Sequence, residues 1–307
     1  MARSTPLVMH HPLVGVIEGA KRAKHRAFVT RKRMRARYIA GRDVTFRAYD
    51  RLVPYEFSVE RHRDSWGHLP RMYFLHRDPP PGTQTGLPVQ DVIYCFWTGD
   101  NALTPGRQAG LASIEARNPD LRLVLVTPQN LSEHLLPEHP LHPVYEHLSL
   151  NHRSDYLRAY FMHHLGGGYS DIKQTDHSWT EAWSRLNSTP ELWAIGYPEV
   201  SSASCGGRDP KLGPDIRWRY RSLIGCATYF FRPNTPFTAE WLREVNSRLD
   251  YYADALSRNP GNTWGNNPGY PIQWIELGSD LFHPLQLKYL PHVGQDATLL
   301  PHLSNHR

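Results

Sequence analysis

Residues 151–174, NHRSDYLRAYFMHHLGGGYSDIKQ, contain the pattern that decides the fold. Apolar side chains at Leu157, Phe161 and Leu165 recur at helical spacing and predict an amphipathic helix. Asp155 and Arg158 lie one turn apart on another face of this helix. The stretch therefore predicts a helix from which one acidic and one basic side chain, Asp155 and Arg158, can reach the same ligand.

Three glycines, Gly166–Gly168, predict the end of this helix, because glycine adopts left-handed backbone angles at little cost. Tyr169–Asp171 then have the pattern of a short strand that ends in a polar side chain. Along an extended segment Asp171 and Lys173 point to the same face. We therefore expect the Asp171 carboxylate and the Lys173 ammonium to enter one loop.

This stretch resembles the GT-A glycosyltransferases that carry the DXD sugar-binding region. That group includes transferases of capsular polysaccharide synthesis and the large clostridial glucosylating toxins, and its motif is approximately SD-x-x-R followed by GG-x-Y-x-D-x-D. Lys173 stands where the family has its second aspartate, a ligand of the divalent metal. The matching residues are Ser154, Asp155, Arg158, Gly166, Gly167, Tyr169 and Asp171.

The resemblance implies a hexosyltransferase-type enzyme that moves a sugar from a nucleoside-diphosphate sugar to a glycan, lipid-linked or glycoconjugate acceptor. It also implies retention of configuration and a role in polysaccharide synthesis, for example of a capsule. Two alternatives stay open. One is a catalytically inactive GT-A domain that binds nucleotide sugar or glycan, which Lys173 favours. The other is a polybasic protein that binds lipid or nucleic acid.

Sugar transfer requires that negative charge on the leaving diphosphate be neutralised. In the family Mn²⁺ or Mg²⁺ does this, but Lys173 would repel a cation. We therefore favour metal-independent chemistry in which Lys173 contacts the diphosphate, Asp171 holds sugar or ribose hydroxyls, and Arg158 binds sugar or phosphate oxygens. These three are the candidate catalytic residues. If a metal is used, Asp171 and His283 are its candidate ligands.

The resemblance extends to Val92–Gly99, where Trp97 matches a family tryptophan that lies against the nucleotide base. These residues also have structural alternatives that need no bound donor. Trp97 is then a residue of the hydrophobic core, Asp155 and Arg158 form a surface ion pair, and Asp171 caps a turn. Asn266 in the Asn-rich C-terminal segment is a further candidate. The candidate donor-binding residues are Trp97, Thr98, Asp155, Arg158, Tyr169, Asp171, Asn267 and Trp274.

Alternating strand and helix patterns predict an α/β domain with a mostly parallel sheet. By the resemblance this is a GT-A, Rossmann-like nucleotide-sugar-binding domain over residues 91–307, preceded by a basic N-terminal extension over residues 1–90. Residues 199–220 lack a clear period and predict an ordered loop over the site. Other expected elements are helices over 105–117 and 129–136, strands over 121–127 and 223–231, and a helix from Pro236 capped by Asn234 or Thr235.

Positive charge is concentrated between Lys21 and Arg42, where ten Lys or Arg residues occur without an acid. Acidic residues outnumber basic ones in the rest of the chain. Such a segment attracts anionic lipid at about 1 kcal/mol per basic residue, or nucleic acid, unless it is simply a solvated arm. We expect residues 21–42 to favour an anionic membrane surface.

Nothing in the sequence predicts a membrane span or a signal peptide, since no run of 18 apolar residues occurs. The three cysteines, Cys95, Cys205 and Cys226, are an odd number and form no C-x-x-C pair. Buried free thiols are typical of a reducing compartment. The sequence thus predicts a cytoplasmic protein, peripheral on the inner face of the membrane if the basic segment binds lipid.

Overall fold

The computed structural model describes residues 12–63, 73–207, 209 and 211–304. The chain divides into two compact units, Met1–Thr45 and Phe46–Arg307. The second unit begins earlier than residue 91, where we expected the domain to start, because Phe74 and Leu75 are buried in the same apolar core as later residues. Residues 1–11 and 64–72 of the expected extension lie outside the described residues.

Helix α1, Pro12–Leu52, forms the first unit up to Thr45. The side chains of Lys21 to Arg37 that carry positive charge are all exposed, and Arg42 is half-buried. Within the described part of the chain, no helix is both long enough and apolar enough to cross a bilayer.

The second unit alternates strands and helices, as the sequence predicts. The strands are β1 Val92–Phe96, β2 Arg122–Val126, β3 Gly167–Ser170, β4 Ala194–Pro198, β5 Ile224–Phe231 and β6 Val293–Gln295. The helices are α2 Pro105–Arg117, α3 Leu150–His164, α4 Thr180–Ser188, α5 Leu212–Trp218, α6 Pro236–Arg258 and α7 Ser279–Lys288.

Two local expectations differ from the structure. The helix expected over residues 129–136 is a short 3₁₀ helix, Leu131–His134, because the prolines that follow leave no room for further turns. The segment 199–220, expected to be a loop, contains α5 in its second half.

The strands form one six-stranded sheet in the order β2-β1-β3-β5-β4-β6. Strand β1 pairs in parallel with β2 and β3, and β4 pairs in parallel with β6. Strand β5 is antiparallel to both of its neighbours, β3 and β4. The sheet is therefore mixed: the expected parallel direction holds for five of the described strands, and β5 alone runs against them.

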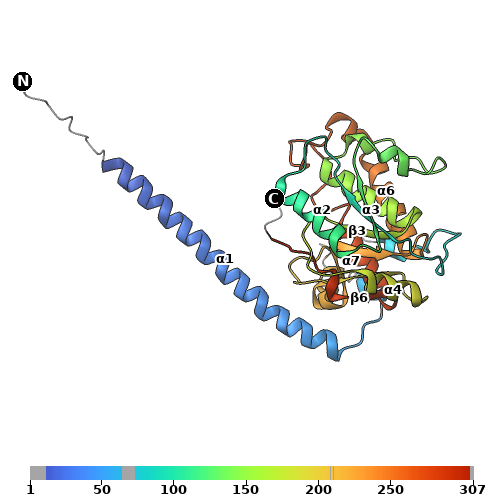
Figure 1. Cartoon of the computed structure of the whole chain (residues 1–307). Coiled ribbons are helices and arrows are strands. Elements are labelled where there is room, and N and C mark those ends of the chain that lie inside the picture. The colour runs from blue at the N-terminus through green and yellow to red at the C-terminus, as the bar shows by residue number, and fades with distance from the viewer. Residues whose placement is uncertain (1–11, 64–72, 208, 210, 305–307) are drawn as a thin grey trace, which may run out of the picture. The chain divides into compact units, whose positions relative to one another are not determined.

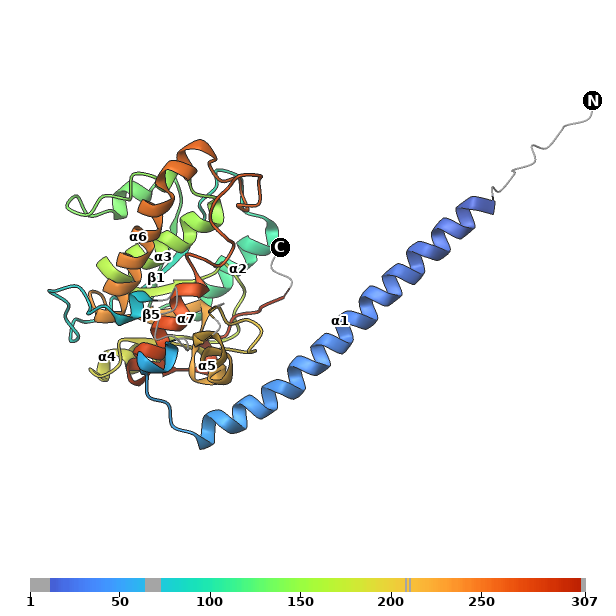
Figure 2. The same ribbon diagram turned by 180° about the vertical axis from the view of Figure 1, so that it is seen from behind.

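Apolar side chains cover both faces of this sheet. Along β1, Val92, Tyr94 and Phe96 belong to one core, and Ile93 and Cys95 to the other, as expected for side chains that alternate along a strand. The first core is completed by α3, α6 and α7, and the second by α2 and α4. Figures 1 and 2 show α3 and α6 side by side, and the two helices are in contact.

Two helix termini have the expected chemistry. Ser149 caps α3 by accepting a hydrogen bond from the His152 amide, and Thr235 caps α6 by accepting one from the Thr238 amide. Helix α3 ends at His164, and the glycines that follow Leu165 are left-handed: Gly166 has φ +67° and Gly167 has φ +93°. The expected glycine stop is confirmed.

The stop at Gly166 yields a prediction about stability. A residue other than glycine would be forced into the left-handed backbone conformation at this position, which is strained for a side chain with a Cβ. That Cβ would also lie 2.9 Å from the Pro233 nitrogen and 2.6 Å from the Pro233 ring carbon Cδ. We expect Gly166→Ala to lower the free energy of unfolding by roughly 2 kcal/mol or more, measured by urea unfolding. Gly86→Ala, whose Cβ would meet nothing within 4 Å, is the matched control. Equal midpoints for the two variants would contradict the argument.

Candidate active site

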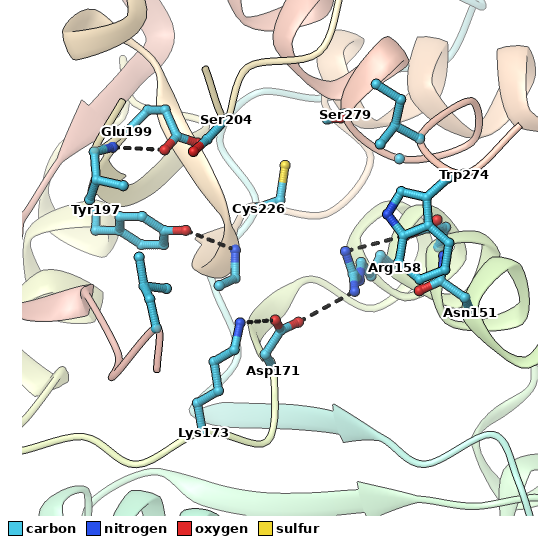
Figure 3. Close-up of a pocket in the computed structure, with 16 residues that line it drawn as sticks. Asn151, Arg158, Asp171, Lys173, Tyr197, Glu199, Ser204, Cys226, Trp274 and Ser279 are labelled. Atoms are coloured by element: carbon cyan, nitrogen blue, oxygen red, sulfur yellow. Dashed lines mark hydrogen bonds and ion pairs between the residues drawn. The ribbon is translucent and has the colours of Figure 1, made fainter. Parts of the chain in front are cut away.

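The carboxyl ends of β3 and β4 and the amino end of β5 meet at one edge of the sheet, because β5 runs against its two neighbours. A pocket of about 290 Å³ opens there. Figure 3 shows the side chains that line it, which come from α3, β4, β5, the segments after β3 and β4, the start of α7 with the segment before it, and Leu303. In open α/β sheets, ligands bind at this kind of edge.

Asp171 lies at the centre of a group of polar contacts in this pocket. Its Oδ2 is 2.6 Å from Lys173 Nζ, and its Oδ1 accepts hydrogen bonds from the Tyr169 hydroxyl at 2.6 Å and from Arg158 Nη2 at 3.3 Å. Burial raises the pKa of Asp171, but the charges of Lys173 and Arg158, together with these hydrogen bonds, outweigh burial and lower the pKa to about 2. Asp171 is therefore ionised at neutral pH.

Arg158 connects Asp171 to a second acid. Its Nη1 is 3.3 Å from Asp155 Oδ1, and its guanidinium carbon lies 4.5 Å from the centre of the Tyr169 ring. Only 16% of the Arg158 side chain and 7% of the Asp155 side chain are exposed, so the two do not form an ordinary surface ion pair. Asp155, Arg158, Asp171 and Lys173 thus form a chain of alternating charges.

Glu199 brings a further carboxylate into the pocket, on the side away from Arg158 (Figure 3). Its Oε1 accepts a hydrogen bond from the Val200 amide at 2.7 Å, and its Oε2 is 3.8 Å from His283 Nε2. Burial raises the pKa of the Glu199 carboxyl. The pocket therefore presents acidic oxygens on two sides, which suits a ligand with several hydroxyl groups.

His283 is fully buried behind Glu199. Its Nδ1 accepts a hydrogen bond from the Gly206 amide at 2.8 Å, so in the neutral ring Nε2 carries the proton. Nε2 faces Glu199 and also lies 3.8 Å from Cys226 Sγ. Burial lowers the pKa of His283 to about 4, and the imidazole is neutral at neutral pH.

The donor set does not fit the divalent metal of the DXD family. Lys173 Nζ takes the position beside Asp171 Oδ2, and Oδ1 already accepts two hydrogen bonds. His283, the other candidate ligand, faces Glu199 instead of Asp171. Across residues 12–63, 73–207, 209 and 211–304, no group of three or more His, Cys, Asp or Glu could hold a metal ion.

Trp97 and Thr98 lie in a second pocket of about 80 Å³, apart from Asp171. Trp97 Nε1 donates to the Asn101 carbonyl at 2.6 Å, and Thr98 Oγ1 donates to the Leu150 carbonyl at 2.6 Å. Leu157 of α3 lines this pocket, and the next residue, Arg158, lines the first one. Helix α3 therefore contributes a different face to each pocket.

The C-terminal candidates divide between two roles. Trp274 lines the first pocket. Asn266 and Asn267 do not line it, and their side-chain amides hold the local turn instead: Asn267 Oδ1 accepts from the Asn262 amide at 3.0 Å, and Asn266 Oδ1 accepts from Asn262 Nδ2 at 2.8 Å.

Several pocket residues were not singled out from the sequence. For Glu199 a signal existed, because it follows a buried strand as Asp171 does, and parallel strands end at the same edge of a sheet. For Cys226 no local signal existed, because its position depends on the reversed direction of β5. The residues that sequence reasoning missed are Asn151, Tyr197, Glu199, Ser204, Cys226 and Ser279.

Comparison with protein-family models gives no match for this chain, and comparison with curated proteins gives none either. A solved structure titled "PaToxG Glycosyltransferase" is similar at a TM-score of 0.39 and 13% sequence identity, over 71% of this chain and 74% of that one. A likeness at this level does not bear on activity, so the functional argument rests on the side chains of the site.

The buried His283 yields a prediction about pH. An unfolded histidine has a pKa near 6.5 and binds a proton that the folded one, with a pKa of about 4, does not. The unfolded state thus binds more protons, and folding stability falls as the pH falls through this window, by about 3 kcal/mol for this residue. His283→Asn, whose amide oxygen can still accept from Gly206, should lose less stability between about pH 7 and pH 4.

Urea unfolding at several pH values measures this difference. His177→Asn replaces an exposed histidine and should leave the pH dependence of the wild type unchanged. If His283→Asn and the wild type lose the same stability over the window, the neutral state assigned to His283 is wrong.

Proposed function

We propose that this protein is a glycosyltransferase that transfers a sugar from a nucleoside-diphosphate sugar to a glycan or glycoconjugate acceptor. The observation that carries the proposal is the chain of alternating charges, Asp155, Arg158, Asp171 and Lys173, in a pocket at the carboxyl edge of the sheet. Its spacing in the sequence is that of the sugar-binding motif described above.

The chemistry of the pocket supports a sugar as the bound group. Asp155 and Glu199 offer carboxylate oxygens that accept hydrogen bonds from hydroxyls, and the Arg158 guanidinium is a rigid donor to oxygen. Arg158 Nε is buried and has no hydrogen-bond partner among the residues that the structure describes. A buried donor of this kind costs free energy until it is satisfied, and a ligand oxygen within reach would satisfy it.

Lys173 supports transfer without a metal. Its ammonium carries three N–H groups, of which one suffices for the contact with Asp171 Oδ2. The remaining N–H groups are free to reach the diphosphate oxygen from which the sugar leaves, and to stabilise the charge that grows there. Asp171 then fixes the position of the ammonium, and hydroxyl binding falls to Asp155, Glu199 and Arg158.

The second pocket supports a place for the nucleotide. Trp97 supplies an aromatic side chain, Thr98 a hydroxyl, and Arg153 a guanidinium beside it. Helix α3 contributes side chains to both pockets. A ligand too long for either pocket would therefore extend across α3, from the pocket of Trp97 to the pocket of Arg158. A nucleoside diphosphate joined to a sugar has this extended form.

We predict slow release of nucleoside diphosphate from one member of a panel of UDP- and GDP-sugars, because water can replace the acceptor. This hydrolysis should persist in excess chelator. Lys173→Met should reduce it on the order of 100-fold, the loss typical of one preorganised transition-state donor. Asp171→Asn should also reduce it, since the ammonium loses its fixed position. Released diphosphate is measured by chromatography.

Lys211→Ala, which removes an exposed lysine outside the pocket, serves as the charge control and should keep wild-type rates. Inhibition by chelator that Mn²⁺ reverses would refute the role of Lys173. Binding of a nucleotide sugar without turnover in any variant would instead identify an inactive, sugar-binding domain. The anomer first released, identified by ¹H NMR, tests the retention that the family resemblance implies.

We further propose that residues 21–42 of α1 bind an anionic membrane surface. At 3.6 residues per turn, their basic side chains spread around more than half of the helix circumference. The helix therefore has no wide apolar face for insertion, and its attraction to lipid is electrostatic. The protein would then act as a peripheral protein at the inner face of a membrane.

Co-sedimentation of the full chain with phosphatidylserine-containing vesicles measures this attraction. Replacing Lys32, Arg33 and Arg35 by Gln should weaken binding roughly 100-fold, at about 1 kcal/mol per residue. Added salt should weaken wild-type binding too, by screening the same charges. The matched control replaces Arg117, Arg122 and Arg258, which are exposed basic residues elsewhere. Equal losses in both triple variants would refute a membrane role for α1.

A further inference from the structure

Two tryptophans are exposed side by side on the segment that joins α6 to α7. Trp264 is 52% exposed and Trp274 is 51% exposed. Their ring centroids lie 6.2 Å apart, and their planes are inclined by 37°. Tryptophan is usually well buried, so two exposed indoles in contact form an apolar patch of the kind that marks a binding surface.

This segment is anchored to the rest of the domain. On the Trp264 side, the Gly261 amide donates a hydrogen bond to the His147 carbonyl at 2.8 Å. The buried His152 of α3 lies with Nε2 3.1 Å from the Gln273 carbonyl and Nδ1 2.8 Å from the Tyr270 hydroxyl. A carbonyl only accepts, so Nε2 carries the proton and Nδ1 accepts from Tyr270. Contacts on both sides thus fix the backbone that presents the two indoles.

The pair continues the charged pocket. Trp274 lines that pocket together with Asp155 and Arg158, and its indole is among the side chains drawn in Figure 3. A ligand whose reacting group lies near Asp171 would therefore meet Trp274 first and Trp264 next on its way out.

The composition of the segment restricts the ligand. No Lys or Arg occurs from Asn259 to Leu287, whereas the acids Glu276 and Asp280 do. The segment itself therefore offers no cation to a polyanion such as a nucleotide. The neighbouring residues Asn262, Thr263 and Asn266 are neutral and polar, so the indoles lie in an uncharged polar stretch. A pyranose ring combines an apolar face of C–H groups with a rim of hydroxyls, and it suits indoles in such a setting.

We infer that Trp264 and Trp274 form a stacking platform for a hexopyranose ring of a glycan acceptor. This inference rests on the proposed function and adds the acceptor class to it. The sugar ring stacks against the face of one indole with the other beside it, its hydroxyls contact the neighbouring polar groups, and its attacking hydroxyl points into the pocket toward the bound donor. No group on the platform takes part in bond making.

Oligosaccharide binding to the full chain tests the inference. The probes are cellohexaose, maltohexaose and an α-1,6-linked mannohexaose, followed by tryptophan fluorescence and calorimetry. We expect at least one to bind, and Trp264→Ala to weaken that binding about tenfold or more. Trp264→Phe retains an aromatic face and should recover most of the affinity. Tyr251→Ala removes an 81% exposed aromatic on α6 and should have no effect.

Each outcome decides one question. If no probe binds the wild type, or if Trp264→Ala and Tyr251→Ala behave alike, the platform is refuted. If Trp264→Ala instead weakens binding of UDP or GDP and leaves oligosaccharide binding intact, the indoles hold the nucleotide and the inference is also refuted. Donor hydrolysis by the wild type reports on the proposed function separately, so its absence together with aromatic-dependent oligosaccharide binding would refute transfer and keep the platform.

Discussion

The carboxylate of Asp171 is the interaction on which the site depends. It is shared by the Arg158 guanidinium of α3, the Tyr169 hydroxyl of β3 and the Lys173 ammonium, which follows β3. Without it, Lys173 would lose its acidic partner and Arg158 would keep only Asp155, and unpaired buried charge is costly. The sharp stop at Gly166 makes the arrangement possible, because it turns the chain back quickly enough for strand β3 to place Asp171 beside the helix that carries Arg158.

Pairing within this group also determines what the pocket can hold. The two cations of the pocket, Arg158 and Lys173, each have an acid beside them, and Glu199 adds a further acidic side chain. A site lined by both acidic and basic side chains provides acceptors and donors together, which favours hydroxyl groups over a dense anion. In the proposed transferase, the diphosphate would therefore rely on the spare N–H groups of Lys173, and the sugar would lie nearer Asp155, Arg158 and Glu199. With these separate roles for the diphosphate and the sugar, a lysine at the second acidic position of the motif would be compatible with sugar transfer.

Sequence reasoning succeeded where the determinants are local. The helix of residues 150–164, its glycine stop and the following strand are set by spacing and by backbone freedom, and the proximity of Asp155, Arg158 and Asp171 follows from them. It failed where position depends on distant pairing. The reversed direction of β5 brings Cys226 to the pocket, and no local pattern distinguishes a strand that returns from one that crosses over. The Asn-rich segment gave a third result, since composition alone does not separate amides that hold a turn, Asn266 and Asn267, from side chains that face a ligand, as Trp274 does.

The buried residues behind the pocket also bear on the kind of chemistry it supports. Cys226, His283 and Glu199 lie close together, as a nucleophile, a base and an orienting acid would. Their connections differ from such a triad, because His283 faces both partners with the same nitrogen and uses the other to accept the Gly206 amide. The ring therefore cannot take the thiol proton at one nitrogen while the acid holds the other. Burial, the largest effect, and the Glu199 charge both raise the pKa of Cys226, so its thiol stays protonated. The Asp171 carboxylate is also occupied, by contacts with Arg158, Tyr169 and Lys173. None of these groups is therefore an activated nucleophile, and in the proposed transferase the sugar would pass directly from donor to acceptor.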